Sequence, residues 1–178
     1  MIALLFAAHL FAETSFAEMV AKALHVPPAA LERSIQNIGD KEFVTVVLKW
    51  STNERCEITK PCRGKWTVER SPDQFPPSSF NRQAPLAHSE PFYLLLVATN
   101  KRDVPLWFGT IGDFRNIEAP PAPDASAGFS WSVLAQAELT IDIPKNIGAT
   151  ALRVYSPTQC GDATCFDLGG TAKLPVLP

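Results

Sequence analysis

The 178-residue chain lacks the short sequence signatures of the common enzyme classes. It contains no G-x-S-x-G turn for a nucleophilic serine and no H-E-x-x-H pair for zinc. It also has no P-loop and no G-x-G-x-x-G turn, which cradle nucleotide phosphates. These absences favour a non-catalytic protein without a cofactor. A catalytic site assembled from distant residues, which leaves no local signature, is the alternative.

Histidine, glycine and charge are also scarce. Nine glycines against sixteen prolines predict fixed loops and interrupted strands instead of long helices. Charged residues make up 19% of the chain and the formal net charge is −2, which gives no global reason to expect nucleic acid or an anionic membrane as a partner. The chain has no N-x-S/T sequon, which fits a bacterial exported protein.

What the chain does have, after residue 40, is strand periodicity. In Glu42–Trp50 the apolar residues recur at every second position from Val44 on. Five further segments read as strands, the second and third of them as a central hairpin around an NKRD turn: Lys65–Glu69, Phe92–Thr99, Val104–Ile111, Ala137–Ile143 and Thr150–Tyr155.

These segments are joined by loops without interleaved helices. We therefore predict a mainly β fold: an immunoglobulin-like antiparallel two-sheet β-sandwich at residues 41–178, with a short helical N-terminal segment. Residues 118–128 are rich in proline and alanine and are expected to form a crossover loop. Tyr155 is expected to face outward, and the end of the chain from Gln159 is expected to be a Cys-closed loop, one short strand and a tail.

Residues 1–17 have the pattern of a signal peptide. The apolar run Ile2–Ala12 is followed by Ser15-Phe16-Ala17, which puts small residues at the −3 and −1 positions of a cleavage site. Export to the periplasm, the cell envelope or the outside follows, with a helical segment at residues 18–40 and no membrane span in the mature chain. No Lys or Arg precedes the apolar run, so the alternative is an amphipathic helix that packs on the β domain.

The four cysteines form two close pairs, Cys56/Cys62 and Cys160/Cys165. In an exported protein this spacing predicts two local disulfides, each stabilising by about 2–3 kcal/mol in the entropic model. Neither spacing is the C-x2-C of a zinc knuckle, so no metal site is predicted. Four cysteines on one zinc ion is the alternative.

Candidate binding residues are the four tryptophans and one histidine. Trp50, Trp66, Trp107 and Trp131 are many for a small core, and one exposed ring could stack on a sugar or anchor a protein. Core burial is the alternative for each. His88 lies in a long loop before the central hairpin, and the alternative is an ordinary surface histidine.

The first functional hypothesis is therefore an exported, non-catalytic binding or accessory module for protein or carbohydrate. The second is a metal-dependent or hydrolytic secreted enzyme whose site gathers His88, Asp113, Asp162 and Asp167. The third is a structural subunit of an envelope assembly that uses the basic stretch Lys41–Arg70 or an open sheet edge.

One variant of the enzyme hypothesis concerns His9. Cleavage after Ala8 would leave His9 at the terminus of a β-sandwich, which resembles the copper monooxygenases that bind copper through such a residue. His25 or His88 would then have to supply the second ligand. Eight residues are too few for a signal peptide, so Ser15-Phe16-Ala17 is the better cleavage site.

Overall fold

Nine strands and one helix make up the described part of the chain. The computed structural model describes residues 16–27, 29, 42–56, 62–71, 93–119, 130–160 and 163–176. All strand pairs in it are antiparallel. The elements are α1 (Phe16–Leu24), β1 (Phe43–Ser51), β2 (Lys65–Arg70), β3 (Tyr93–Thr99), β4 (Pro105–Gly112), β5 (Asn116–Ala119), β6 (Ser130–Val133), β7 (Gln136–Pro144), β8 (Ala151–Cys160) and β9 (Ala163–Lys173). The prediction of a mainly β chain with antiparallel sheets is confirmed.

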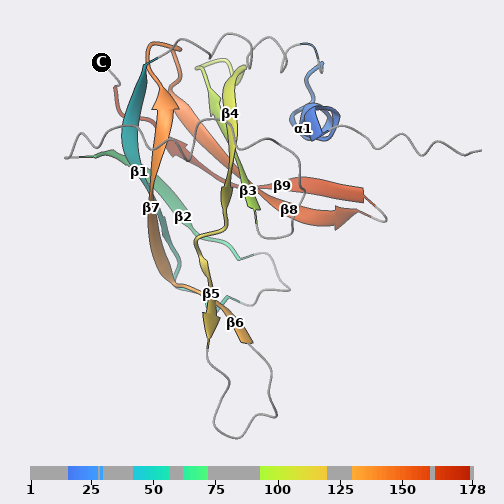
Figure 1. Cartoon of the computed structure of the whole chain (residues 1–178), viewed down its shortest axis with the longest axis vertical. Coiled ribbons are helices and arrows are strands. Elements are labelled where there is room, and N and C mark those ends of the chain that lie inside the picture. The colour runs from blue at the N-terminus through green and yellow to red at the C-terminus, as the bar shows by residue number, and fades with distance from the viewer. Residues whose placement is uncertain are drawn as a thin grey trace, which may run out of the picture.

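The strands form three sheets (Figure 1). A three-stranded sheet has the order β2-β1-β7, a four-stranded sheet has the order β4-β3-β8-β9, and β5 and β6 form a separate pair. The predicted central hairpin is present as β3 and β4, with Leu94 opposite Ile111. Asn100 closes its turn by accepting, through Oδ1, hydrogen bonds from the backbone N–H groups of Arg102 and Val104.

One core lies between the two larger sheets. β1 alternates strictly between buried and half-buried positions, so Val46, Leu48 and Trp50 point to the same side, as their spacing predicts. Both sheets contribute side chains to the same cluster, which includes Leu94 and Leu96 from β3 and Val154 from β8. The alternation in the sequence therefore positions the core directly.

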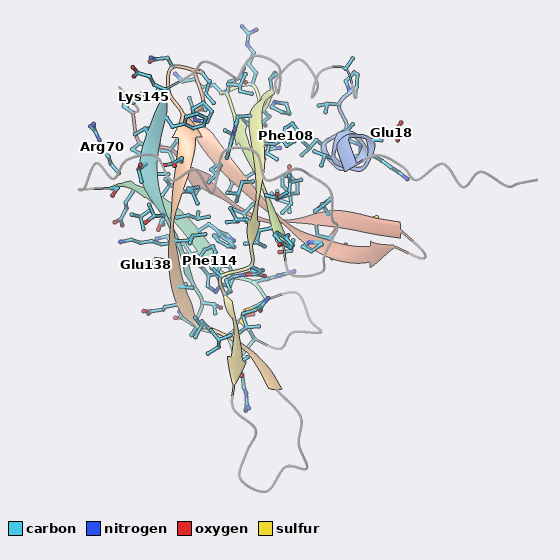
Figure 2. The ribbon with its side chains drawn as sticks, viewed as in Figure 1. Glu18, Arg70, Phe108, Phe114, Glu138 and Lys145 are labelled. Atoms are coloured by element: carbon cyan, nitrogen blue, oxygen red, sulfur yellow. A yellow bond between two sulfur atoms is a disulfide. The ribbon has the colours of Figure 1, made fainter. Side chains whose placement is uncertain are left out.

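The other face of the four-stranded sheet is covered by α1 (Figures 1 and 2). Val20 and Ala21 of the helix are 0% and 2% exposed. They pack against an apolar patch on the sheet, which we call the outer face, formed by Leu95, Val97, Phe108 and Tyr155. Tyr155 does point away from the core, as predicted, but the cover leaves it only 6% exposed. This cover explains why β3 is apolar on both faces.

The helix begins at Phe16 and so includes the last two residues of the predicted signal peptide. The structure does not test cleavage, and export remains a prediction. No helix in the described ranges has the length and apolar character needed to cross a membrane. Of the predicted helical segment 18–40, the structure describes residues 18–27 and 29, and the others lie outside the described residues.

Two expectations for loops were wrong. Glu118 and Ala119 of the predicted crossover loop belong to β5, which pairs with β6 through Asn116–Val133 and Ala119–Ser130. The predicted loop from Gln159 is mostly strand, because β8 runs to Cys160 and β9 starts again at Ala163. These two strand regions are polar or contain proline and show no apolar alternation, so the sequence did not predict them as strands.

Lys49 carries an exposed ion pair on the opposite side of β1 from the core. Its Nζ lies 2.6 Å from Oε2 of Glu69. The hydrogen bond to Glu69 is the largest cause that raises the pKa of Lys49 above its ordinary value; desolvation opposes it, and the charges of Glu69 and Glu138 add to it. The stabilisation from this pair is thus complete below the ordinary lysine pKa and is lost as pH rises through the raised one.

We expect Glu69→Gln to lower the pKa of Lys49 toward its ordinary value, because the substitution removes the carboxylate charge. An NMR titration of the lysine ε-methylene groups measures this change. Glu54→Gln, at an exposed position of the β1–β2 loop, should leave the Lys49 titration unchanged. An unaltered Lys49 curve in the Glu69 variant would contradict the assignment.

Candidate functional site

The pair β5–β6 projects from the sheets as a two-stranded arm (Figure 1). Its strands pair with each other and, among the described strands, with no other. β5 follows β4 after a short turn and β6 leads into β7, so the arm grows out of both larger sheets. Ile117 on the arm is 42% exposed.

A buried ion pair fixes the turn at which the arm begins. Arg115 donates from Nε to Asp113 Oδ1 at 2.7 Å and from Nη2 to Asp113 Oδ2 at 2.6 Å. The two side chains are only 10% and 8% exposed. The Arg115 backbone N–H also donates to Asp113 Oδ1 at 3.2 Å. This bidentate geometry holds the turn in one conformation.

Two tryptophan rings lie against the guanidinium group. Its Cζ is 5.0 Å from the ring centroid of Trp50 and 5.3 Å from that of Trp66. The two rings are 4.9 Å apart and tilted by 51°, and Phe114 meets Trp66 edge-on at 6.1 Å. We call this group of five residues, Trp50, Trp66, Asp113, Phe114 and Arg115, the arm base. Cation–π attraction adds to the ion pair in holding Arg115 in place.

Both strands of the arm are tied to the arm base through the backbone at Leu134. Trp50 Nε1 donates to the Leu134 carbonyl oxygen at 3.3 Å. The Leu134 N–H donates to the Arg115 carbonyl oxygen at 2.8 Å. Arg115 Nη2 also donates to Ser156 Oγ of β8 at 3.3 Å, which connects the base to the four-stranded sheet. The arm therefore leaves the domain from a fixed origin.

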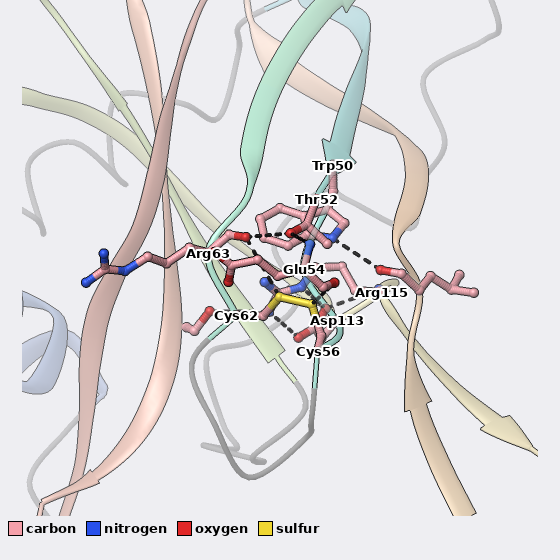
Figure 3. Close-up of a disulfide and its surroundings, with 10 residues drawn as sticks. Trp50, Thr52, Glu54, Cys56, Cys62, Arg63, Asp113 and Arg115 are labelled. Carbon is pink, nitrogen blue, oxygen red and sulfur yellow. Dashed lines mark hydrogen bonds and ion pairs between the residues drawn. A yellow bond between two sulfur atoms is a disulfide. The ribbon is translucent and has the colours of Figure 1, made fainter.

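The described residues of the β1–β2 connection, 52–56 and 62–64, lie next to Trp50 (Figure 3). Cys56 and Cys62 form a disulfide with Cα atoms 5.4 Å apart, which confirms the first predicted pair and leaves no thiolate there for zinc. Thr52 Oγ1 donates to the Arg63 carbonyl oxygen at 2.7 Å and accepts from the Glu54 N–H at 3.1 Å. These bonds hold the loop on both sides of the disulfide.

Gly64 follows the disulfide and lies directly against the Trp50 ring. A Cβ at this position would overlap three ring carbons of Trp50. We expect Gly64→Ala to lower the free energy of unfolding by about 1–3 kcal/mol, because the ring or the loop has to move. Gly112→Ala is the matched control, since a Cβ there meets nothing within 4 Å. Chemical denaturation measures both, and equal stabilities would contradict this packing.

Three of the predicted binding residues are core residues. Trp50, Trp66 and Trp107 are 2%, 4% and 6% exposed, so these three residues are buried in the core. Trp131 lies on β6 opposite Glu118, but its side chain is outside the described part, as is His88. Their binding roles remain predictions.

The second predicted disulfide is described only in part. Cys165 is disulfide-bonded and lies opposite Thr158 on the β8–β9 hairpin. The side chain of Cys160 lies outside the described residues, so the pairing itself remains a prediction.

Asp113 and Asp167, two of the four residues of the enzyme hypothesis, are each connected to Ser156. Ser156 accepts from Arg115, the partner of Asp113, and is itself the cross-strand partner of Asp167. His88 and Asp162 lie outside the described residues. Within the described ranges there is no group of three or more His, Cys, Asp or Glu able to hold a metal ion.

Sequence reasoning named Asp113 but missed Arg115, the residue that organises the arm base. The available signal was the Asp-x-Arg spacing at the end of a strand, which suits a side-chain clamp across a turn. The Asp113 carboxylate neutralises the Arg115 guanidinium, so the arm base is suited to holding the arm in place and not to transferring protons.

Comparison with known protein families, curated proteins and solved structures finds no match for this chain.

Proposed function

We propose that this protein is an exported binding module of immunoglobulin-like architecture that recognises a partner protein through its arm. The observation that carries the proposal is the combination of a fixed arm base with a projecting pair of strands. A rigid origin lowers the entropy lost when the arm is ordered against a partner. The outer edges of a two-stranded ribbon also offer backbone groups for an added strand.

Strand order supports the immunoglobulin-like part of the proposal. Without the arm, seven strands divide between the two larger sheets, and β3, β8 and β9 adjoin as the third, sixth and seventh strands of an immunoglobulin domain do. There are two departures from that arrangement. β4, the fourth strand, joins β3 in the four-stranded sheet, whereas the fourth strand of an immunoglobulin constant domain lies in the opposite sheet. The second departure lies in the three-stranded sheet. There β1 occupies the central place, between β2 and β7, that the second strand takes in an immunoglobulin constant domain.

Export is supported by the disulfide and by the signal-like first seventeen residues. Disulfides persist mainly in oxidising compartments outside the cytoplasm, and Cys56–Cys62 is compatible with such a place. A protein partner is favoured over a carbohydrate because the three described tryptophan side chains are buried and Ile117 is exposed on the arm.

The test compares partners retained by purified wild-type protein and arm variants from an extracytoplasmic extract. In one variant Asn-Gly replaces residues 118–131 and joins the cross-strand partners Ile117 and Ser132. In the other, Ile117→Asp places a charge on the arm. Val104→Asp is the control, because Val104 is a similarly exposed apolar residue at 47%, on the β3–β4 turn.

We expect a partner protein to be retained by the wild type and by the Val104 variant and to be lost from both arm variants. The same retained proteins in all four samples would overturn the proposal. Binding to a glycan array by the wild type and the shortened variant alike would favour carbohydrate recognition away from the arm.

A further inference from the structure

The Cys56–Cys62 disulfide lies two residues before Gly64, which packs against the Trp50 ring of the arm base (Figure 3). Cys62 packs against the core cluster that contains Trp50 and Trp66. Both cysteines are half-buried, and the flanking residues Arg55 and Arg63 are exposed. The bond is thus close to the arm base and also open to a reductant from solvent.

We propose that the redox state of this disulfide controls how well ordered the arm is. The oxidised form holds the arm base in place, and reduction loosens it. The proposal rests on the proposed function only in making the arm the binding element. The physical coupling runs through contacts of the described residues and can be followed one by one.

The first contact is between the loop and Trp50. With the disulfide closed, Thr52 Oγ1 donates a 2.7 Å hydrogen bond to the Arg63 carbonyl oxygen, and Gly64 packs against the Trp50 ring. Opening the disulfide removes the covalent link between Cys56 and Cys62, and with it a constraint that keeps the nearby Gly64 in place. The Trp50 ring then loses its packing contact with the backbone of Gly64.

The second contact is between Trp50 and the arm. The indole N–H of Trp50 bonds the Leu134 carbonyl at the end of β6, and its ring stacks on Arg115 at the start of β5. A ring that moves weakens both contacts together. The arm has no other described strand to hold it, so loss of its base is expected to increase local opening of β5 and β6.

The redox step is a thiol–disulfide exchange with a dithiol reductant. One thiolate of the reductant attacks a sulfur of the Cys56–Cys62 bond, breaks that bond and forms a mixed disulfide. The second thiolate of the reductant then displaces the remaining cysteine. Two electrons and two protons pass to the cysteines, which become thiols, and the reductant becomes a disulfide.

The experiment measures amide hydrogen exchange in the protein without a partner. A C160S/C165S variant retains only Cys56 and Cys62, so a dithiol has one known target. After reduction we expect the Leu134 amide and the arm amides at 117, 119, 130 and 132 to exchange at least about tenfold faster. The β3 amides of Leu94–Ala98 should keep their protection.

Two further variants make the result independent of the reductant. C56S/C62S should show fast exchange in the arm without any dithiol. Thr52→Val keeps the disulfide but removes the hydroxyl that bridges Glu54 and Arg63, and it should give a smaller increase. Thr67→Val, on the solvent side of β2, is its control and should give none.

Unchanged arm exchange in the reduced protein and in both the C56S/C62S and Thr52 variants would overturn the proposal. Loss of protection in β3 together with the arm would also overturn it, because the disulfide would then hold the whole domain and not the arm base. Since no partner is needed, failure here leaves the binding test of the arm intact, and failure to find a partner leaves the exchange result intact.

Discussion

Arg115→Leu is expected to lower the free energy of unfolding by about 3–5 kcal/mol, because it leaves the Asp113 carboxylate buried without its partner. That carboxylate is 8% exposed and accepts both of its side-chain hydrogen bonds from the guanidinium. The substitution also removes the charge that lies on Trp50 and Trp66. Urea denaturation followed by circular dichroism measures the change.

Two companion variants separate the buried pair from a general loss of charge. Lys145→Ala breaks an ion pair with Glu42 that is largely solvated, and it should cost no more than about 1 kcal/mol. Arg115→Leu combined with Asp113→Leu removes both charges and should recover much of the lost stability, since no unpaired carboxylate remains. A double variant less stable than the single one would show that the pair itself, and not the orphaned charge, accounts for the loss.

Val20→Asp is expected to detach α1 and expose the outer face of the four-stranded sheet. Val20 is fully buried against Leu95, Val97, Phe108 and Tyr155, and a carboxylate cannot remain there unpaired. Because the helix can leave the sheet, the loss is limited to the helix docking energy, about 2–4 kcal/mol for several apolar side chains. Dye binding to exposed apolar surface should rise in proportion.

Lys22→Ala is the control on the same helix, because Lys22 faces solvent. It should change neither stability nor dye binding. A folded Val20→Asp variant with wild-type stability and no dye binding would contradict the packing of α1 on the outer face.

Period-2 alternation was sufficient to predict most of the two larger sheets. β1 and β2 follow their predicted segments to within a residue or two, and so does the β3–β4 hairpin. The grouping of Val44, Val46, Leu48 and Trp50 on one face of β1 is the predicted one, because side chains two residues apart lie on the same side of a strand. Local sequence decides these features, so sequence reasoning reaches them.

The arm and its base were not predictable in the same way. β5 and β6 are four residues each and are stabilised by pairing with each other across a stretch without periodicity. Burial of Arg115 runs against the usual exposure of arginine, and it depends on two rings that are distant in the sequence. The packing of α1 on the sheet was not predictable either, because apolar residues at helical spacing predict a helix but not the surface that it contacts.

The closeness of Trp50 and Trp66 has a spectroscopic consequence. Indole rings whose centroids lie 4.9 Å apart at a tilt of 51° couple their electronic transitions. Such a chiral pair gives paired bands of opposite sign in the ultraviolet circular dichroism spectrum, and these bands vanish when either ring turns away. The molecule thus carries its own optical reporter of how these two side chains are arranged, without any label.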